Sequence, residues 1–465
     1  MDGPKNSFVT QLRVLIAYKD LLRNHFGPIS RWYFKRFRRS QMEAAKKLRG
    51  KDCLEVAFFL TIPGMWKADE VFEAMQQHPH FHPYAVIYPF AVYKDFVAEE
   101  EQRTIERCRE FMEKKGFEYV IPYDEKRRKW LDIRSVAKPD IIVFTNPYKD
   151  SYPKYYVDHF KEVFTCYIPY GYSSISILRK NYDSFFINLV GLHFVESELH
   201  RKMVAENSRN NAENAVVTGY PATEVFLRDD FVSKDLWKPQ HKDKKKVIFA
   251  PHHSIDQKEY TSLFLEVCDV MLELAEKYSD AIQFAFKPHQ MLLFKLQQLW
   301  GVEKTEAYYH KWDALENAQL VSDGYVDLFL TSDAMIHECG SFTTEYLFVR
   351  KPVMYLCSET DMTGKFNEFG IHSFNCHYHG RTREDIERFL QEVVLEGKDP
   401  LKPARDQFFE DYLKPKDGML PSQKILKVLE EVINGQGLAD YSPSTSLNFP
   451  ITASSEYFSK NICRE

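Results

Sequence analysis

The sequence lacks the short motifs by which several large enzyme classes are recognised. It contains no Gly-x-Gly-x-x-Gly, no Walker phosphate-binding loop, no His-Glu-x-x-His and no Gly-x-Ser-x-Gly. Dehydrogenases, P-loop kinases, zinc proteases and α/β-hydrolases depend on these patterns, so none of these classes has its usual support. The eight cysteines lie far apart without a Cys-x-x-Cys pair, which argues against a zinc ribbon or a disulfide scaffold and favours a reducing cytoplasm.

Long hydrophobic runs and a strong charge imbalance are also absent. The apolar stretch at residues 8–18 is interrupted by Arg13 and is much shorter than the ~20 apolar residues that a membrane-spanning helix needs. The formal net charge of -5 gives the chain as a whole no attraction to nucleic acids. With 44% hydrophobic and 28% charged residues, the composition is that of a globular protein, which we expect to be cytoplasmic.

One segment departs from this balance, because residues 31–51 are rich in Lys and Arg and contain a single acid, Glu43. Four aromatic residues lie among the cations: Trp32, Tyr33, Phe34 and Phe37. Basic and aromatic side chains together suit the headgroup region of an anionic leaflet, where each cation contributes ~1 kcal/mol. We expect this segment either to hold the protein peripherally at the inner face of the plasma membrane or to pack its aromatics on the first lobe.

From residue 52 onward, short apolar runs alternate with amphipathic stretches of helical length. Runs such as residues 140–146 (DIIVFTN) and 245–250 (KKVIFA) are typical of parallel strands covered on both faces. We therefore predict an α/β fold with two doubly wound, Rossmann-like lobes, a cleft between them and a joint near residues 230–246. The expected divisions are a helical segment at 1–51, an acceptor-side lobe at 52–235, a donor-side lobe at 245–400, C-terminal helices packing across the lobes at 401–440, and a loose tail at 441–465.

In open parallel sheets, ligands bind beyond the carboxyl ends of the strands, which makes the turn after residues 334–336 a candidate phosphate site. Gly340 lets the chain approach a phosphate closely, and Ser341 and Thr343 add hydroxyl donors. A helix opening at Ser341 would present its unpaired N–H groups to the same anion. Glu345, further along this helix, is placed to accept hydrogen bonds from ribose. The alternative interpretation is an ordinary N-cap at Ser341 that binds no ligand.

Three histidines follow neighbouring apolar runs of the second lobe. His252 and His253 come after VIFAP, and His289 comes after FAFKP. Near pH 7 a histidine can donate to a phosphate or be protonated by it. We therefore expect all three to bind the phosphates of a nucleotide-activated donor.

Other histidines alternate in sequence as metal ligands can: His78, His80 and His82, and His377 and His379. Neither set has an evident fourth ligand, so we expect no metal.

In their types and their order along the chain, these motifs resemble those of the CDP-glycerol glycerophosphotransferase family. That family comprises the teichoic-acid primases and polymerases with a GT-B fold. Lys287-Pro288-His289 matches the family's Lys-Pro-His turn, and Gly219-Tyr220-Pro221 matches its Gly-Tyr-Pro stretch. The family's last motif is matched by Ser332-Asp333, Ile336, Glu338 in place of an aspartate, Gly340-Ser341, Glu345 and Lys351-Pro352. Order and spacing agree over residues 140–357.

The resemblance implies a transferase that takes glycerol phosphate, or a related polyol phosphate, from CDP-glycerol or a related CDP-polyol. The implied acceptor is a glycan, a lipid-linked group or a polymer in surface or capsular polymer synthesis, and no cofactor is implied. The alternative is a nucleotide-sugar glycosyltransferase of the same fold. A non-catalytic nucleotide-binding subunit is the alternative from another class.

Two motifs depart from the family pattern. The family's Pro-Thr-aromatic-Arg turn is Pro251-His252-His253-Ser254 here, without the arginine. The family's His-Gly turn, whose histidine is the general base, is Tyr170-Gly171, and a tyrosine with a pKa near 10 is a poor base at neutral pH. We therefore expect the base within residues 146–171, at Asp158 or His159 and, failing these, at Tyr170.

Overall fold

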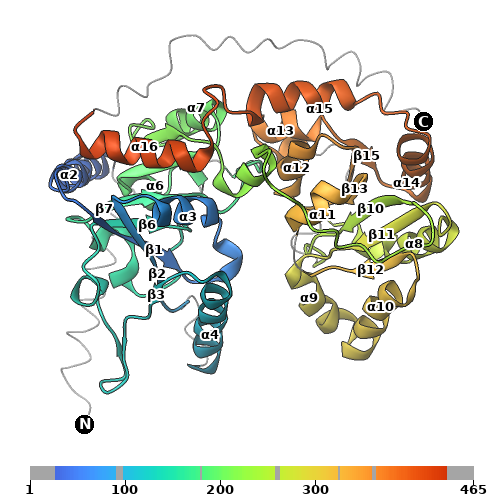
Figure 1. Cartoon of the computed structure of the whole chain (residues 1–465), viewed down its shortest axis with the longest axis horizontal. Coiled ribbons are helices and arrows are strands. Elements are labelled where there is room, and N and C mark those ends of the chain that lie inside the picture. Colours follow the sequence, from blue (N-terminus) through green and yellow to red (C-terminus); the bar gives the residue numbers. More distant parts are fainter. Residues whose placement is uncertain are drawn as a thin grey trace.

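The structure, a computed structural model, describes residues 27–90, 98–177, 181–256, 262–322, 325–358 and 363–436. Two parallel β-sheets, each flanked by helices, lie side by side as two lobes (Figure 1). The predicted α/β fold with two doubly wound lobes is confirmed. Among the described helices, none is both long enough and apolar enough to cross a membrane.

The N-terminal lobe is built on a seven-stranded parallel sheet in the order β3-β2-β1-β6-β7-β8-β9. Its strands are β1 (Leu54–Leu60), β2 (Phe81–Ile87), β3 (Tyr119–Val120), β6 (Ile141–Phe144), β7 (Phe164–Tyr167), β8 (Leu192–Val195) and β9 (Ala215–Val217). Every residue of β6, β7 and β8 is buried, because helices cover both faces of the sheet.

The helices of this lobe are α2 (Gly27–Lys46), α3 (Asp69–Gln77), α4 (Ala98–Lys115), α6 (Phe185–Leu189) and α7 (Glu198–Asn207). Short 3-10 turns connect them: η1 (Pro63–Met65), η2 (Ile133–Ser135), η3 (Pro153–Tyr155), η4 (Val157–His159) and η5 (Pro221–Leu227). A separate antiparallel pair consists of β4 (Tyr123–Asp124) and β5 (Lys129–Trp130).

The C-terminal lobe repeats this topology with six parallel strands in the order β12-β11-β10-β13-β14-β15. They are β10 (Lys245–Ala250), β11 (Ile282–Phe286), β12 (Ala318–Leu320), β13 (Ala334–His337), β14 (Val353–Leu356) and β15 (Tyr378–Gly380). In both sheets the strand order reverses beside the first strand, between β1 and β6 and between β10 and β13. Such switch points are where open α/β sheets bind ligands.

The helices of the second half are α8 (Phe264–Lys277), α9 (Gln290–Trp300), α10 (Val302–Ala314), α11 (Tyr325–Thr331), α12 (Phe342–Glu345), α13 (Glu368–Phe374), α14 (Arg383–Arg388), α15 (Lys402–Phe408) and α16 (Pro421–Ile433). Shorter turns are η6 (Tyr346–Val349) and η7 (Thr363–Lys365), and two wider helical turns are η8 (Phe389–Leu395) and η9 (Phe409–Leu413). The helix expected to open at Ser341 is therefore one turn of α-helix that tightens into η6. It ends at Arg350, whose φ of 55° is left-handed.

The last helix packs back onto the first lobe, as predicted. Ile425, Leu429 and Val432 of α16 enter the core that also contains β1 and α3. Helix α16 lies across the first lobe beside α3 (Figure 1). Both the backbone N–H and the hydroxyl of Ser422 donate to the buried carboxylate of Glu224 at 2.7 Å. The chain thus returns from the second lobe and ends its last helix on the first.

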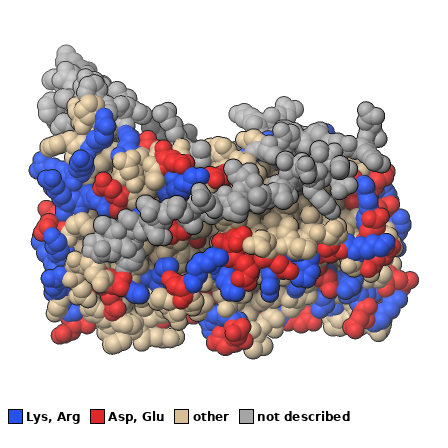
Figure 2. All heavy atoms as spheres, turned by 90° about the horizontal axis from the view of Figure 1, so that it is seen from above, with Lys and Arg blue, Asp and Glu red and all other residues tan. Residues whose placement is uncertain are grey.

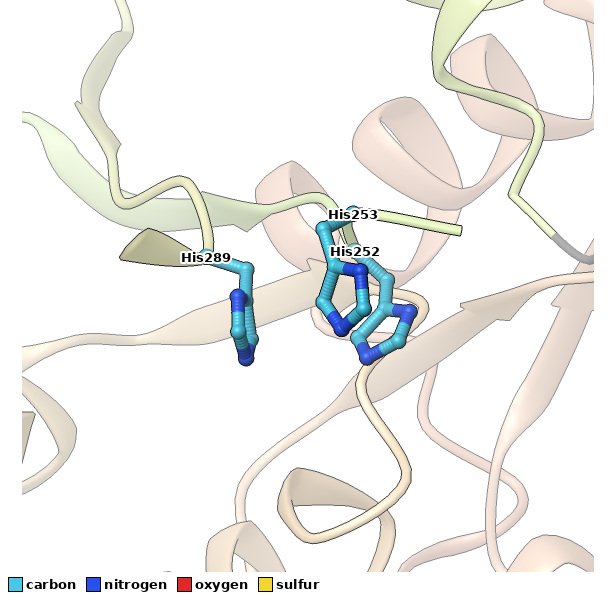
Figure 3. Close-up of side chains that lie close together, drawn as sticks. All are labelled: His252, His253 and His289. Carbon is cyan, nitrogen blue, oxygen red and sulfur yellow. The ribbon is translucent and has the colours of Figure 1, made fainter. Parts of the chain in front are cut away.

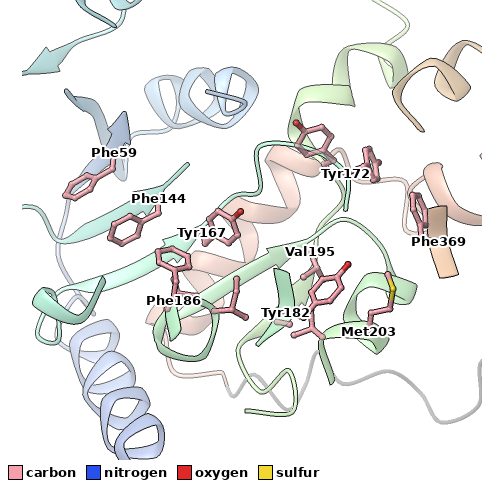
Figure 4. Close-up of a cluster of buried hydrophobic side chains, with 14 of the residues drawn as sticks. Phe59, Phe144, Tyr167, Tyr172, Tyr182, Phe186, Val195, Met203 and Phe369 are labelled. Atoms are coloured by element: carbon pink, nitrogen blue, oxygen red, sulfur yellow. The ribbon is translucent and has the colours of Figure 1, made fainter. Parts of the chain in front are cut away.

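The carboxyl ends of the two sheets meet at the lobe interface. Tyr172, after β7, stacks on Phe369 of the second lobe with ring centroids 5.6 Å apart and planes 5° apart (Figure 4). Ser174 donates through its hydroxyl to the carbonyl of Gly340 at 3.2 Å, and Ile175 pairs with Phe366 as an isolated β-bridge. The residues that follow the strands of one lobe thus contact those that follow the strands of the other.

Candidate functional site

The donor-side candidates leave the second sheet at its switch point. Strands β10 and β13 are paired so that Ala250 lies beside His337, and the turns that follow them emerge together. The backbone N–H of His252 donates to the carboxylate of Glu338 at 3.1 Å, and the N–H of His289 donates to the carbonyl of Pro251 at 3.1 Å. Three separate turns are therefore fastened to one another.

The structure brings the three predicted histidines together. The ring centroids of His252 and His253 are 4.2 Å apart, those of His253 and His289 are 4.3 Å apart, and those of His252 and His289 are 5.1 Å apart. The three rings point in the same direction from their turns, with a ring nitrogen at the free end of each (Figure 3). We call these residues the histidine cluster.

His252 and His289 of the histidine cluster are electrically neutral at physiological pH. Burial, followed by repulsion from the other imidazoles and Lys295, lowers the pKa of His252 to about 3, and burial with similar repulsion lowers that of His289 to about 4. Nδ1 of His289 accepts the N–H of Met291 at 3.1 Å and caps α9, which places the proton of the neutral ring on Nε2. The ring of His289 therefore offers an N–H donor without a charge.

The Gly-Ser turn keeps only part of its predicted role. Ser341 stands at the N-cap position of α12, but its hydroxyl makes no capping hydrogen bond. Its contact with phosphate stays a prediction. A Cβ on Gly340 would lie 3.2 Å from Ile175 of the other lobe, which shows how closely the chain is packed there. Thr343 is fully buried and its hydroxyl donates to the carbonyl of Cys339 at 3.1 Å. That single donor is already used, so the expectation that Thr343 binds phosphate is wrong.

Glu345 lies buried at the lobe interface. Burial raises the pKa of its carboxyl, whereas Lys67 of the N-terminal lobe acts in the opposite direction. Burial and, to a smaller extent, the charge of Glu345 raise the pKa of three surrounding tyrosines: Tyr172, Tyr220 and Tyr325. Its contact with ribose stays a prediction.

Glu338 emerges as a residue that organises the site, whereas the sequence identified it only by its place in a motif. Its buried carboxylate accepts from the hydroxyl of Ser262 at 2.6 Å and from the N–H of Leu263, in addition to the N–H of His252. Burial outweighs these three donors and raises the pKa of Glu338 to about 7.

The predicted bases of the first lobe have other partners. Nε2 of His159 lies 2.6 Å from the carboxylate of Asp132 and 2.6 Å from the guanidinium of Arg134. The adjacent Asp158 occupies the same short turn, η4, and raises the pKa of Tyr156. This arrangement favours a structural role for η4. The base assignment to Asp158 or His159 stays a prediction.

Tyr170 is even less able to act as a base in its folded environment, because its ionised form is further disfavoured. Its hydroxyl shares a 2.6 Å hydrogen bond with that of Tyr148, and burial together with this bond raises its pKa above the ordinary value of 10. At neutral pH the phenol therefore keeps its proton.

Sequence reasoning missed Asp150, which lies in the same segment after β6. It is 4% exposed, burial raises its pKa to about 7, and its Oδ2 atom has no hydrogen-bond partner. Thr61 and Asn146 lie beside it, after β1 and β6, and Asn146 donates to the Thr61 hydroxyl at 3.2 Å. Asp150 therefore sits at the switch point of the first sheet, and its position soon after a buried strand was the available signal.

The other histidine sets lie with ordinary partners. His78 and His80 face Glu430, and His82 lies 3.0 Å from the carboxylate of Glu55. His377 is buried and His379 stacks on Phe374 at 3.9 Å.

A family model described as CDP-Glycerol:Poly(glycerophosphate) glycerophosphotransferase matches residues 179–430, more than half of the chain. The teichoic acid poly(ribitol-phosphate) polymerase of Bacillus spizizenii is 26% identical over 181 residues, which cover 36% of this chain and 26% of that protein. The chain thus spans about a quarter of the length of the curated relative that it matches.

Solved structures share the fold. The UDP-GlcNAc 2-epimerase from Neisseria meningitidis superposes with a TM-score of 0.51 and 13% identity over 82% of this chain and 99% of that chain. The wall teichoic acid polymerase TagF superposes with a TM-score of 0.50 and 12% identity over 90% of this chain and 98% of that chain. At these identities the likeness shows the fold alone, and the predicted GT-B architecture is confirmed.

Proposed function

The chain belongs to the CDP-glycerol:poly(glycerophosphate) glycerophosphotransferase family, and we propose on that basis that it transfers a polyol phosphate from a CDP-activated donor. The donor is CDP-glycerol or a related CDP-polyol. The acceptor is a hydroxyl of a glycan, a lipid-linked group or a growing polymer in cell-surface or capsular polymer synthesis.

One observation carries this proposal: the family match covers every strand of the second lobe. Residues 179–430 include the histidine cluster and the Gly340–Ser341 turn, which emerge from one sheet edge at its switch point. At this edge the Nε2–H of His289 and the hydroxyl of Ser341, which makes no capping bond, are donors suited to a pyrophosphate.

The reaction needs positioning and charge stabilisation more than covalent chemistry from the protein. The acceptor oxygen forms a bond to the β-phosphorus of the donor as the bond from that phosphorus to the bridging oxygen breaks. CMP leaves with the bridging oxygen, and the acceptor's proton passes to a base. The histidine cluster and the turn at Ser341 would stabilise the negative charge on the phosphates.

Asp150 is our candidate for the base. A buried carboxyl with a pKa of about 7 can accept a proton near neutral pH, whereas an ordinary exposed aspartate is too weakly basic. Its place at the switch point of the first sheet puts it on the acceptor side of the interface, where the family's histidine is replaced by Tyr170. His159 is the competing candidate.

Helix α2 supports a further part of the proposal, contact with an anionic membrane surface. Phe34 and Phe37 are buried against the first lobe, so packing accounts for these two aromatics. Trp32 remains 60% exposed, and the guanidinium of Arg36 lies 5.5 Å from its ring centroid. Lys and Arg gather at the end of the molecule that holds α2 (Figure 2). An exposed tryptophan among cations suits a lipid headgroup layer.

A panel of nucleotide-activated compounds tests the main proposal. We expect CDP-glycerol or CDP-ribitol to stabilise the protein by ~2.7 kcal/mol at 100 times its Kd, and to release CMP when an acceptor is added. UDP-sugars and CMP-sugars should do neither. Stabilisation by a nucleotide sugar alone would instead support a glycosyltransferase, and binding of a CDP-polyol without turnover would support a binding subunit.

A further inference from the structure

We propose that the histidine cluster is a binding site for one divalent transition-metal ion of the zinc class, held by His252, His253 and His289. Each residue offers one ring nitrogen, and the three atoms lie within 4.8 Å of one another. Over the part of the chain that the structure describes, this is the one group of three potential metal ligands that meets this geometry. The sequence pattern placed these histidines at one sheet edge as phosphate ligands, and only the folded chain shows that their ring nitrogens converge.

The geometry is close to that of a loaded trihistidine site. Zinc binds imidazole nitrogen at roughly 2.0–2.1 Å with tetrahedral angles, which separates its ligands by about 3.4 Å. The three nitrogens therefore need to approach one another by only a little over 1 Å. The three rings extend in the same direction from their turns, so small side-chain rotations can bring the nitrogens together (Figure 3).

A metal takes the lone pair of a neutral imidazole ring, so protons and a metal ion compete for the same three nitrogens. Three rings this close cannot all carry a positive charge, so a single bound cation is a better partner for them than three added protons.

The hydrogen bonds of the Nδ1 atoms favour metal binding by His252 and oppose it for His289. Nδ1 of His252 lies 2.9 Å from the hydroxyl of Ser254, a partner that can fix the tautomer with Nε2 available as a ligand. Nδ1 of His289 instead accepts the N–H of Met291, so ligation by Nε2 requires the proton to move to Nδ1 and this cap bond to open. One cap bond is weak compared with a metal–imidazole bond.

Nearby charges indicate which kind of ligand occupies the fourth coordination position of the ion. Lys287 lies two residues before His289, and Lys295 of α9 pairs with Asp256 at 2.6 Å. An ion beside two lysines attracts an anion, and three protein ligands leave one position open, as in catalytic zinc sites. A phosphate oxygen of the donor fits that position, a step that rests on the proposed function.

Cobalt(II) provides a direct test on the full chain after treatment with a chelator. We expect one equivalent to saturate the protein and to give the visible absorption of a four- or five-coordinate ion, without the near-ultraviolet band of a thiolate ligand. Zinc should displace it. The variants His253→Ala and His289→Asn should weaken binding by more than the 10- to 100-fold that loss of an outer-shell partner costs. His289→Asn retains a side-chain acceptor for the cap of α9.

The matched control is His241→Ala, which removes a histidine that is 97% exposed in the linker and should leave cobalt binding unchanged. Thermal melts of each metal-stripped variant confirm that the protein is folded. Absence of saturable binding, or binding that is equal in His253→Ala and the parent, would overturn the metal site.

Addition of CDP-glycerol separates this inference from the proposed function. A change in the cobalt spectrum, with loss of turnover in chelator and its recovery with zinc, supports both. Turnover that is unaffected by chelator overturns the metal's role while the transferase proposal stands. A metal site that forms normally in a protein that neither binds nor consumes a CDP-polyol supports the metal site and counts against the transferase proposal.

Discussion

The carboxylate of Glu338 accepts the backbone N–H of His252 at 3.1 Å, and this bond fastens the two donor-side turns to each other. Through Ser262 and Leu263 the same carboxylate also anchors the chain that leads into α8. The geometry of the histidine cluster thus depends on a buried side chain that has no need to touch the donor.

Replacement of Glu338 should therefore affect stability and donor binding together. Glu338→Ala leaves three buried donors without their acceptor, at ~1–3 kcal/mol each, so we expect the free energy of unfolding to fall by ~3 kcal/mol or more. Glu338→Gln keeps one acceptor oxygen and should cost less. Urea unfolding and titration with the donor measure the two effects. Normal donor affinity in folded Glu338→Ala would show that Glu338 is not needed to hold the two donor-side turns in place.

His289 combines a capping role with its proposed contact to phosphate, and two substitutions separate them. His289→Ala removes the cap of α9 and should cost ~0.5–2 kcal/mol of stability, whereas His289→Asn keeps a capping oxygen. If the ring stabilises charge in the transition state, both variants should lose roughly 10- to 1000-fold in turnover. His310→Ala, on α10, is the exposed control. A normal rate in His289→Asn would show that His289 caps α9 and does not stabilise charge in the transition state.

Membrane contact through α2 should depend on charge and salt. Arg38 is engaged with Glu213, so the informative reversals are Arg36→Glu and Arg39→Glu on the exposed side. We expect the double variant to lose most of its binding to vesicles containing phosphatidylserine, and salt to release the parent protein. The matched control reverses Lys126 and Lys129 near the β4–β5 turn. An equal loss of vesicle binding in both double variants would indicate a general effect of charge and would exclude a membrane-binding surface on α2.

The sequence was sufficient for the fold because nearly every buried strand is a continuous apolar run. The strands β10, β11 and β13 also placed the histidine cluster correctly, since their carboxyl ends had to share one sheet edge. Strands β12 and β15 were not predicted, because three residues each carry too little pattern to distinguish them from loops.

The environments of individual side chains could not be predicted from the sequence in the same way. Thr343 looked available for phosphate, and only the folded chain shows that its hydroxyl is buried against Cys339. His159 had the more suitable ordinary pKa, yet it is Asp150, an ordinary acid in sequence, that folding buries beyond the end of β1 and β6. Burial depends on contacts that are distant in sequence, and therefore a single chain without its structure does not reveal it.

The choice of base gives a pH-dependent prediction. If Asp150 accepts the proton, it must be ionised, so kcat/KM should rise with pH to a plateau with a midpoint near 7. Asp150→Asn should lower turnover by ~100- to 10,000-fold, whereas His159→Ala should keep the acidic limb. The opposite pattern would assign the base to His159. Tyr170→Phe removes the phenol that replaces the family's histidine and completes the comparison.

Asp150 should also make the folded protein less stable as the pH rises. Its pKa is about 7 when folded and near 3.8 when unfolded, so between pH 4 and 7 the folded state holds a proton that the unfolded state has lost. Stability then falls by ~1.4 kcal/mol per pH unit for this group, reaching roughly 4 kcal/mol above pH 7. Asp150→Asn removes this loss, so its advantage over the parent should grow from near zero at pH 4 to a few kcal/mol at pH 8. Asp280→Asn, an exposed control, should follow the parent at every pH in urea unfolding. An advantage that does not change between pH 4 and 8 would show that the Asp150 carboxyl ionises normally in the folded chain, and the case for it as the base would be lost.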